Sequence, residues 1–314
     1  MQGFGTIISS IVYLAIIIGI GFVSFKTGYM TQDAKATLSK VVVRITLPLL
    51  VISTLTKLTI TPELMKNAIF IVITSFVCIS VLYIIGVLIG KLFKLEKATA
   101  VVHSIMMAFG NVVFLGYPLI QALYGETGLF YAACYAFVND ALVWTFAVYQ
   151  LAKYGNNSVD KLPWQKCISP PTVSFAIAIV MMIFGLKVTG VLARVFDSVG
   201  SMTTPISMLF IGATLASVDL KSILKRLAIM PAFLIKMLVV PALLTMILVH
   251  IPVDPVAKCV VAFQIAMPSQ TIMAIISQEY KADTTYAAAV IFTTTLLSMA
   301  TLPLMYMIIN YFCA

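Results

Sequence analysis

The stretch GNVVFLGYP, from Gly110 to Pro118, decides the fold of this chain. It lies in the middle of an apolar segment, residues 98–123, that is long enough to cross a bilayer. Two glycines, an asparagine and a proline within nine residues predict that the helix is interrupted here. Main-chain groups freed in hydrocarbon are tolerated only where protein or a water-filled cavity satisfies them. The break is therefore a candidate binding site.

A second break is predicted in the other half of the chain. The sequence AMPSQ, Ala266 to Gln270, places Pro268 in the middle of the apolar segment 256–280. Pro268 follows Gly110 by 158 residues, about half of the 314-residue chain. A second matched pair of positions, Pro48 and Pro205, lies 157 residues apart. These matched offsets predict two related halves that meet at their breaks.

The composition predicts an all-helical integral membrane protein. The chain is 61% hydrophobic and 10% charged, whereas soluble domains carry about 25% charged residues. The apolar segments are too long and uniform for the alternating strands of an outer-membrane barrel. Ten of them reach the length of about 20 residues that a spanning helix needs. These segments are residues 4–25, 37–56, 67–90, 98–123, 127–151, 170–187, 197–217, 227–250, 256–280 and 284–311.

The basic residues predict the topology. If the ten segments cross in turn, the loops on one side hold thirteen Lys and Arg and those on the other side hold five. The richer side is expected to be cytoplasmic, with both termini outside and the linker 153–169 inside. The net charge of +9 is thereby explained by the orientation of the chain in the membrane, and it does not indicate a nucleic-acid partner. Because five crossings is an odd number, residues 1–152 and 170–314 are expected to form two inverted five-helix repeats.

The breaks supply neutral hydrogen-bonding groups and helix ends. Gly110 removes a side chain and Asn111 adds a carbonyl and an amide, while Pro268 lacks an N–H. The N-terminal ends of half-helices suit an anion, and their C-terminal ends suit a cation. The alternative is a pair of ordinary proline kinks. The candidate crossing and substrate-binding residues are Gly110, Asn111, Asn139, Asp140, Pro268, Ser269, Gln270 and Thr271.

Three charged residues are candidates for ion coupling. Asp140, beside Asn139 in segment 127–151, is interpreted as a proton carrier, a sodium ligand or the partner of a buried cation, or alternatively as a helix-packing group. Lys236 could attract an anion or pair with Asp140, or could extend to the interface. Glu279 closes segment 256–280 as an interfacial residue or at the mouth of a pathway.

The sequence contains no catalytic equipment. HExxH, GxSxG, P-loop and CxxC motifs are absent, and the five cysteines have no metal-type spacing. We therefore expect no enzyme activity, no cofactor, no bound metal and no transport driven by ATP from within this chain.

The quoted motifs resemble those of the auxin efflux carrier family, which includes bacterial malate- and malonate-type permeases and plant PIN-type carriers. The resemblance rests on GNVVFLGYPL from Gly110, AMPSQ from Ala266, SQEY ending at Tyr280, ten segments and outward termini. It covers essentially the whole chain. The family is itself distantly similar to sodium–bile acid symporters and sodium–proton antiporters of the crossed-helix type.

The resemblance implies a scaffold of segments one, two, six and seven, and a transport domain of segments three to five and eight to ten. It also implies homodimers that contact through scaffold segments two and seven, and an elevator-like movement with the substrate beside the crossed breaks. Asn111 and Pro268 match the crossing residues, and Asn139 or Asp140 matches a polar substrate-facing position. Gly110 replaces the proline of the plant pattern, and the central loop is short. Both departures fit a bacterial permease.

The expected function is a secondary active carrier for a small organic anion, such as a carboxylate, in the bacterial cytoplasmic membrane, with H⁺ or Na⁺ as a possible coupling ion. One alternative is a sodium-coupled symporter or cation–proton antiporter on the same fold. Another is a membrane sensor that binds its ligand without moving it across. The sequence leaves these alternatives open.

Overall fold

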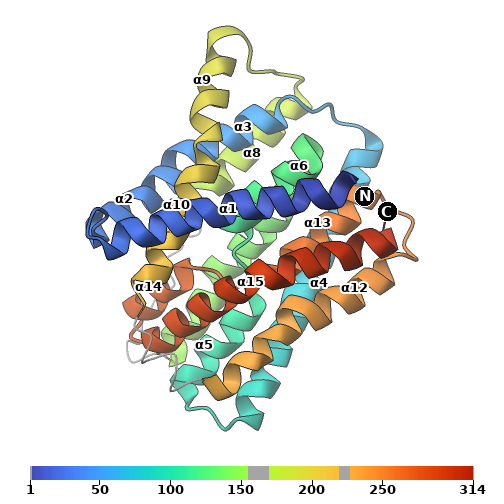
Figure 1. Cartoon of the computed structure of the whole chain (residues 1–314). Coiled ribbons are helices and arrows are strands. Elements are labelled where there is room, and N and C mark those ends of the chain that lie inside the picture. Colours follow the sequence, from blue (N-terminus) through green and yellow to red (C-terminus); the bar gives the residue numbers. More distant parts are fainter. Residues whose placement is uncertain (1, 155–169, 219–226, 314) are drawn as a thin grey trace. The chain divides into compact units, whose positions relative to one another are not determined.

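Helices, joined by short turns and loops, make up the regular secondary structure of the residues that the structure describes (Figure 1). This computed structural model describes residues 2–154, 170–218 and 227–313. Within these ranges there is no strand, and one isolated antiparallel bridge joins Gly110 to Ser269. Most of the expected linker 153–169 lies outside the described residues.

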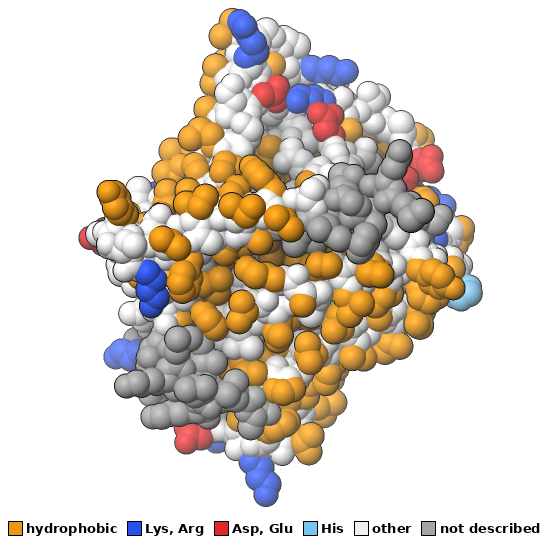
Figure 2. Space-filling model, viewed as in Figure 1, with side chains coloured by type: hydrophobic (Ala, Val, Ile, Leu, Met, Phe, Trp, Pro, Cys, Tyr) orange, Lys and Arg blue, Asp and Glu red, His pale blue; other side chains and the backbone are white. Residues whose placement is uncertain are grey.

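Six helical stretches of the described chain are long and apolar enough to cross a membrane. They are Gln32–Leu55, Pro62–Leu92, Val112–Tyr154, Gly190–Ala216, Met230–Leu248 and Thr284–Phe312. Shorter apolar helices cover Val12–Lys26, Pro170–Ile183 and Pro255–Ala266. The face drawn in Figure 2 is mostly hydrophobic, with few charged side chains in view. The all-helical membrane class is thus confirmed, while the count of ten crossings and the outward termini stay predictions.

The chain divides into two compact units, and neither unit is a continuous stretch of sequence. The first unit comprises Met1–Ile71, Val113–Phe137 and Ile168–Ser217. The second comprises Val72–Val112, Val138–Cys167 and Val218–Ala314. The division into repeats at 1–152 and 170–314 concerns internal symmetry and stays a prediction.

Close helix packing holds the first unit together. Its α1 packs along α10 at two glycines, Gly21 and Gly212. A Cβ added at either glycine would collide with the main chain of the facing helix, at Leu209 or at Ile18. Its helices are α1 (Gln2–Lys26), α2 (Gln32–Val41), the π-helical turn η1 (Val42–Thr46), α3 (Leu47–Leu55), α8 (Pro170–Ile183), α9 (Gly190–Ser201) and α10 (Thr203–Ala216), together with the first part of α4 (Pro62–Leu92) and most of α6 (Tyr117–Leu142).

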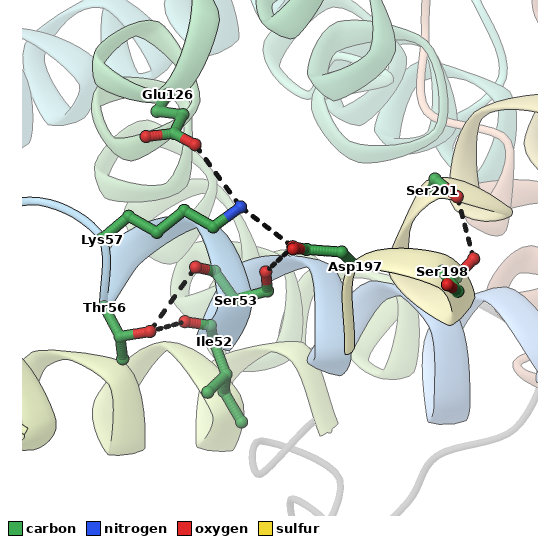
Figure 3. A network of polar contacts seen from close by, with 8 residues as sticks. All are labelled: Ile52, Ser53, Thr56, Lys57, Glu126, Asp197, Ser198 and Ser201. Carbon is green, nitrogen blue, oxygen red and sulfur yellow. Dashed lines mark hydrogen bonds and ion pairs between the residues drawn. The ribbon is translucent and has the colours of Figure 1, made fainter. Parts of the chain in front are cut away.

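A polar network lies just beyond the end of α3 in the first unit (Figure 3). Lys57 Nζ lies 2.9 Å from Asp197 Oδ1 on α9 and 3.5 Å from Glu126 Oε1. The hydroxyl of Ser53 donates to the same Asp197 oxygen. The hydrogen bond to Asp197 is the main cause that raises the pKa of Lys57 above its ordinary value. The network therefore joins three segments that are distant in sequence.

Helix α6 (Tyr117–Leu142) turns sharply at Gly125, where φ is 63° and ψ is −148°. This conformation is open to glycine and strained for other residues. The helical run therefore consists of two helices that meet at Gly125, in agreement with the separate segments 98–123 and 127–151.

The second unit packs its helices around two short helices that end in mid-segment. Helix α5 contacts α7 and α15, and α13 contacts α12 and α15. Residues 257 and 259–271 of α13 and the chain that follows it are all buried. The helices are α5 (Lys97–Ala108), the π-helical turn η3 (Val143–Ala147), α7 (Val148–Tyr154), the 3-10 turn η5 (Leu227–Ala232), the π-helical turn η6 (Ile235–Val239), α12 (Val240–Leu248), α13 (Pro255–Ala266), α14 (Ile272–Glu279) and α15 (Thr284–Cys313), together with most of α4 (Pro62–Leu92) and the end of α6.

Candidate functional site

The first predicted break is present. Helix α5 ends at Ala108, and Phe109 is extended, with φ −98° and ψ 127°. Helical structure resumes at Val112 in the π-helical turn η2 (Val112–Gly116), which leads into α6. Gly110 lies at the centre of the break, where a Cβ would be 3.2 Å from Met267 Cβ and 3.3 Å from the Gln264 carbonyl oxygen. Glycine thus allows the second broken segment to approach the first.

The second predicted break is also present. Helix α13 ends at Ala266, Met267 is extended, and α14 begins at Ile272. Pro268 lies between the two helices, where its missing N–H leaves no donor unsatisfied.

The two breaks lie side by side within the second unit and satisfy each other's main chain. The N–H of Asn111 donates to the Pro268 carbonyl at 2.7 Å. The N–H of Gln270 donates to the Phe109 carbonyl at 3.2 Å. Both bonds flank the Gly110–Ser269 bridge. An apolar environment requires such pairing of freed main-chain groups, so the crossing is a defined structure and not two independent kinks.

Side-chain donors satisfy the main-chain carbonyls at the C-terminal end of α5. The Ser269 hydroxyl donates to the Met106 carbonyl at 2.8 Å, and Lys236 Nζ donates to the carbonyls of Met106 at 3.0 Å and Phe109 at 2.7 Å. The Ser269 N–H donates to Thr294 Oγ1 on α15 at 3.1 Å. The end of the first half-helix is thereby tied to η6, to the second break and to α15.

Asn111 has a buried side chain whose amide is not used by the protein. The residue is 1% exposed. In the described part of the chain, neither Oδ1 nor Nδ2 meets a hydrogen-bond partner. Thr271, at the start of α14, is 5% exposed, and its hydroxyl is likewise without a partner among the described residues. Both donor and acceptor groups are therefore free at the crossing.

Asn139 and Asp140 join the crossing through Gln270. Asn139 is fully buried, and its Nδ2 lies 3.4 Å from Gln270 Oε1 and 3.3 Å from Asp140 Oδ1. Asn139 Oδ1 has no partner among the described residues, while Asp140 is half-buried. The structure thus brings all eight predicted binding residues to one region of the second unit.

The three candidates for ion coupling, Asp140, Lys236 and Glu279, do not all lie at the crossing. Lys236 is fully buried beside the crossing, but the ion pairs of the described residues do not include a pair with Asp140. Glu279 is exposed at the far end of α14 from Thr271. Lys236 therefore belongs to the crossing and Glu279 does not.

Two polar residues of this region were missed by the sequence interpretation. Gln264 Nε2 lies 3.5 Å from the Val112 carbonyl, and Thr294 accepts from Ser269. A glutamine in the apolar run AFQIA was a usable signal, because amides at membrane depth need partners. Thr294 lies among other threonines of α15, and nothing in its local sequence singles it out.

A cavity of about 310 Å³ lies within the second unit beside the first break. Its walls are almost entirely apolar and include Phe109, the residue before Gly110. It is lined by Phe76, Ile79, Ser80, Tyr83, Ile84, Phe109, Leu142 and Phe146. A cavity of this size and polarity is typical of small-molecule sites.

Long apolar helices and a buried crossing of two interrupted helices together define a membrane transport protein. Comparison with known proteins agrees, because residues 6–306 match the family model described as Membrane transport protein. The chain belongs to this family, which is the auxin efflux carrier family.

Two archaeal proteins are similar over almost the full length. An uncharacterised transporter of Methanocaldococcus jannaschii is 23% identical over 298 residues, which cover 94% of this chain and 96% of that protein. An uncharacterised transporter of Methanothermobacter thermautotrophicus is 21% identical over 301 residues, with coverage of 94% and 96%. The family and these names indicate a membrane transporter.

Proposed function

We propose that the protein is a secondary active carrier that moves a small organic anion, a carboxylate, across the bacterial cytoplasmic membrane. The substrate would bind at the crossing of the two broken helices, in contact with Asn111.

The buried amide of Asn111 carries this proposal. Buried polar atoms are nearly always hydrogen-bonded, and each unsatisfied group costs about 1–3 kcal/mol. Asn111 leaves both its oxygen and its nitrogen without protein partners in the described chain. Because the unsatisfied amide costs free energy and makes no hydrogen bond to the protein, we expect it to form hydrogen bonds with a ligand.

The electrostatics of the crossing favour an anion. The N-terminal end of α14 begins at Ile272, and such an end carries partial positive charge. The Thr271 hydroxyl and the Asn111 amide add neutral donors. A carboxylate could accept from several of these groups.

The neighbouring cavity favours an organic substrate over an inorganic one. A carboxylate held at the polar crossing could extend its carbon skeleton along the apolar walls near Phe109. The size of the cavity, about 310 Å³, is suited to a small acid.

The proposed movement is elevator-type alternating access in a homodimer. Segments three to five and eight to ten would move against a scaffold of segments one, two, six and seven, with dimer contacts through segments two and seven. The support is membership of the family and the matched spacing of the two breaks.

A second candidate is cation coupling or exchange through Asp140. This carboxylate is hydrogen-bonded to Asn139 at the crossing, and a carboxylate at membrane depth is a functional candidate by default. If Asp140 carries the coupled ion, Asp140→Asn removes the effect of a sodium or proton gradient and retains exchange of the acid.

The deciding experiment is counterflow in proteoliposomes with labelled carboxylates, including malate and malonate, with and without sodium and a pH gradient. Saturable exchange of one acid supports the proposal. Sodium- or proton-linked cation flux without acid exchange favours the second candidate. Binding of an acid by folded protein without any flux would overturn both in favour of a sensor.

A further inference from the structure

Lys236 is a fully buried lysine whose hydrogen bonds go to main-chain carbonyls. It lies in the π-helical turn η6 and has 0% of its surface exposed. Its Nζ donates to the carbonyl oxygens of Phe109 at 2.7 Å and Met106 at 3.0 Å. Among the described residues, no carboxylate lies within ion-pair distance of it. Its electrostatic partner is therefore the main chain.

That main chain is the C-terminal end of a half-helix. Met106 lies in the last turn of α5, and Phe109 is the residue that follows the helix end at Ala108. The end of a helix carries partial negative charge, and in transporters with broken helices such ends and unwound carbonyls coordinate the coupling cation. The ammonium group of Lys236 occupies the position that suits a cation.

The same two carbonyls have no acceptor capacity left for a further cation. Each carbonyl oxygen has two lone pairs. The Met106 oxygen accepts from Lys236 and from Ser269 Oγ, and the Phe109 oxygen accepts from Lys236 and from the Gln270 N–H. A sodium ion could gain these oxygens only if it displaced the lysine.

We infer that Lys236 is a resident cation that takes the place of a coupling metal ion at the end of the first half-helix, so that this site operates without sodium. The inference rests on the proposed carrier function. It assigns Lys236 a positioning role, in which its charge and two hydrogen bonds hold the Phe109 carbonyl and, through it, the backbone of Gln270. Removal of the ammonium group should leave a vacated carbonyl site that sodium can enter.

The test compares the wild-type protein with Lys236→Met, which keeps the length of the side chain and removes the charge. Lys35→Met is the matched control, because Lys35 is a half-buried lysine of the first unit that donates to Ser217 at 3.0 Å. Each protein is measured in sodium, potassium and choline chloride at equal ionic strength, by thermal unfolding in detergent and by counterflow of the exchanged acid.

For the wild-type protein and for Lys35→Met, the unfolding temperature of each protein should be the same in all three salts. The rate at which each protein exchanges the acid should vary by no more than about twofold between the salts. Lys236→Met should lose at least about tenfold in exchange in choline, and its unfolding temperature should rise with sodium in a saturable manner. A saturable sodium response of the wild-type protein that Asp140→Asn does not remove would overturn the inference. So would a folded Lys236→Met protein that shows no sodium response, because Lys236 would then be a structural crosslink.

If Lys236→Met does not fold, the sodium response of the wild-type protein still tests the inference. The variant Lys236→Arg retains the charge, and its unfolding temperature should therefore not depend on sodium. The thermal readout also separates this inference from the proposed function, because it needs no substrate. If no acid is exchanged but the sodium pattern of unfolding holds, the carrier proposal fails and the assignment of Lys236 stands. If an acid is exchanged only with sodium and Asp140→Asn keeps that dependence, the carrier proposal stands and the assignment of Lys236 fails.

Discussion

The main-chain N–H of Asn111 donates a 2.7 Å hydrogen bond to the carbonyl oxygen of Pro268, which joins the two broken helices of the second unit. This contact uses no side-chain atom of Asn111. The residue therefore holds the crossing with its backbone and leaves its amide for another partner. Structure and function at this position can be separated by mutation.

Asn111→Ala should abolish acid exchange without loss of stability. The substitution removes two buried polar atoms that lack protein partners, so we expect an unchanged or slightly higher unfolding temperature. Asn67→Ala is the contrasting control, because Asn67 Nδ2 donates to the Tyr131 hydroxyl at 3.1 Å in the first unit. That control should lose about 1 kcal/mol of stability and retain exchange per folded molecule. Exchange by Asn111→Ala at the parental rate would show that the crossing is not the binding site.

Gly110→Ala should weaken the crossing itself. The new Cβ would lie 3.2 Å from Met267 Cβ and 3.3 Å from the Gln264 carbonyl oxygen, both closer than ordinary contact. Because overpacking costs about 1–3 kcal/mol, we expect a lower unfolding temperature together with a loss of exchange. Gly19→Ala in α1 is the matched control, since no atom beyond its own stretch of helix lies within 4 Å of its added Cβ. Equal unfolding temperatures for the two variants would contradict the close approach at Gly110.

The breaks could be predicted from the sequence because their causes are local. Glycine, asparagine and proline at Gly110, Asn111 and Pro268 act on their own turns of helix, whatever surrounds them. The matched spacing then indicated that the breaks meet. The partners of Lys236 could not be predicted, since burial at membrane depth is compatible with a carboxylate, a substrate or a carbonyl as its partner. Only the tertiary arrangement of η6 beside the end of α5 selects the carbonyls.

Asn139 and Gln270 should be energetically coupled. Asn139 Nδ2 lies 3.4 Å from Gln270 Oε1, and both residues are buried. In a double-mutant cycle with Asn139→Ala and Gln270→Ala, we expect an interaction energy in unfolding of about 0.5–1.5 kcal/mol. Ser80→Ala combined with Gln270→Ala serves as the non-contacting control. A cycle energy near zero would contradict the contact through which Asn139 joins the crossing.

Lys57 should stabilise the first unit in a manner that depends on pH. Its pKa is raised above the ordinary 10.5, chiefly by the hydrogen bond to Asp197. A raised pKa in the folded state means that the contribution is complete below pH 10.5 and is lost as the pH rises through the folded-state value. Because Lys57 and Asp197 are exposed, the contribution is expected to be about 0.2–1 kcal/mol.

This contribution can be measured as the difference in unfolding temperature between wild type and Lys57→Met. The difference should be constant from neutral pH to pH 9, shrink above pH 10.5 and decrease with added salt. Lys66→Met, at an exposed lysine of α4, should show no such profile. A difference that persists at pH well above 10.5 would assign the effect of Lys57 to packing and not to its charge.

Phe146→Ala should change which acids are exchanged. Phe146 lines the apolar cavity and packs edge-on against Tyr83, with ring centroids 4.8 Å apart. Removal of the ring enlarges the cavity beside Phe109, so acids with a longer or branched carbon skeleton should compete better in counterflow than they do with the wild-type protein. Because the carboxylate would still bind at the crossing, the smallest acids should lose at most a few-fold in apparent affinity.

The measurement is competition of a homologous series of carboxylic acids against one labelled acid. Phe312→Ala is the control, since Phe312 lies near the end of α15 and does not line this cavity. If Phe146→Ala weakens every acid by the same factor, the cavity does not receive the substrate skeleton. If the preference shifts towards longer acids while Asn111→Ala remains inactive towards all of them, the crossing and the cavity form one site, with the charge of the substrate bound at the former and its carbon chain at the latter.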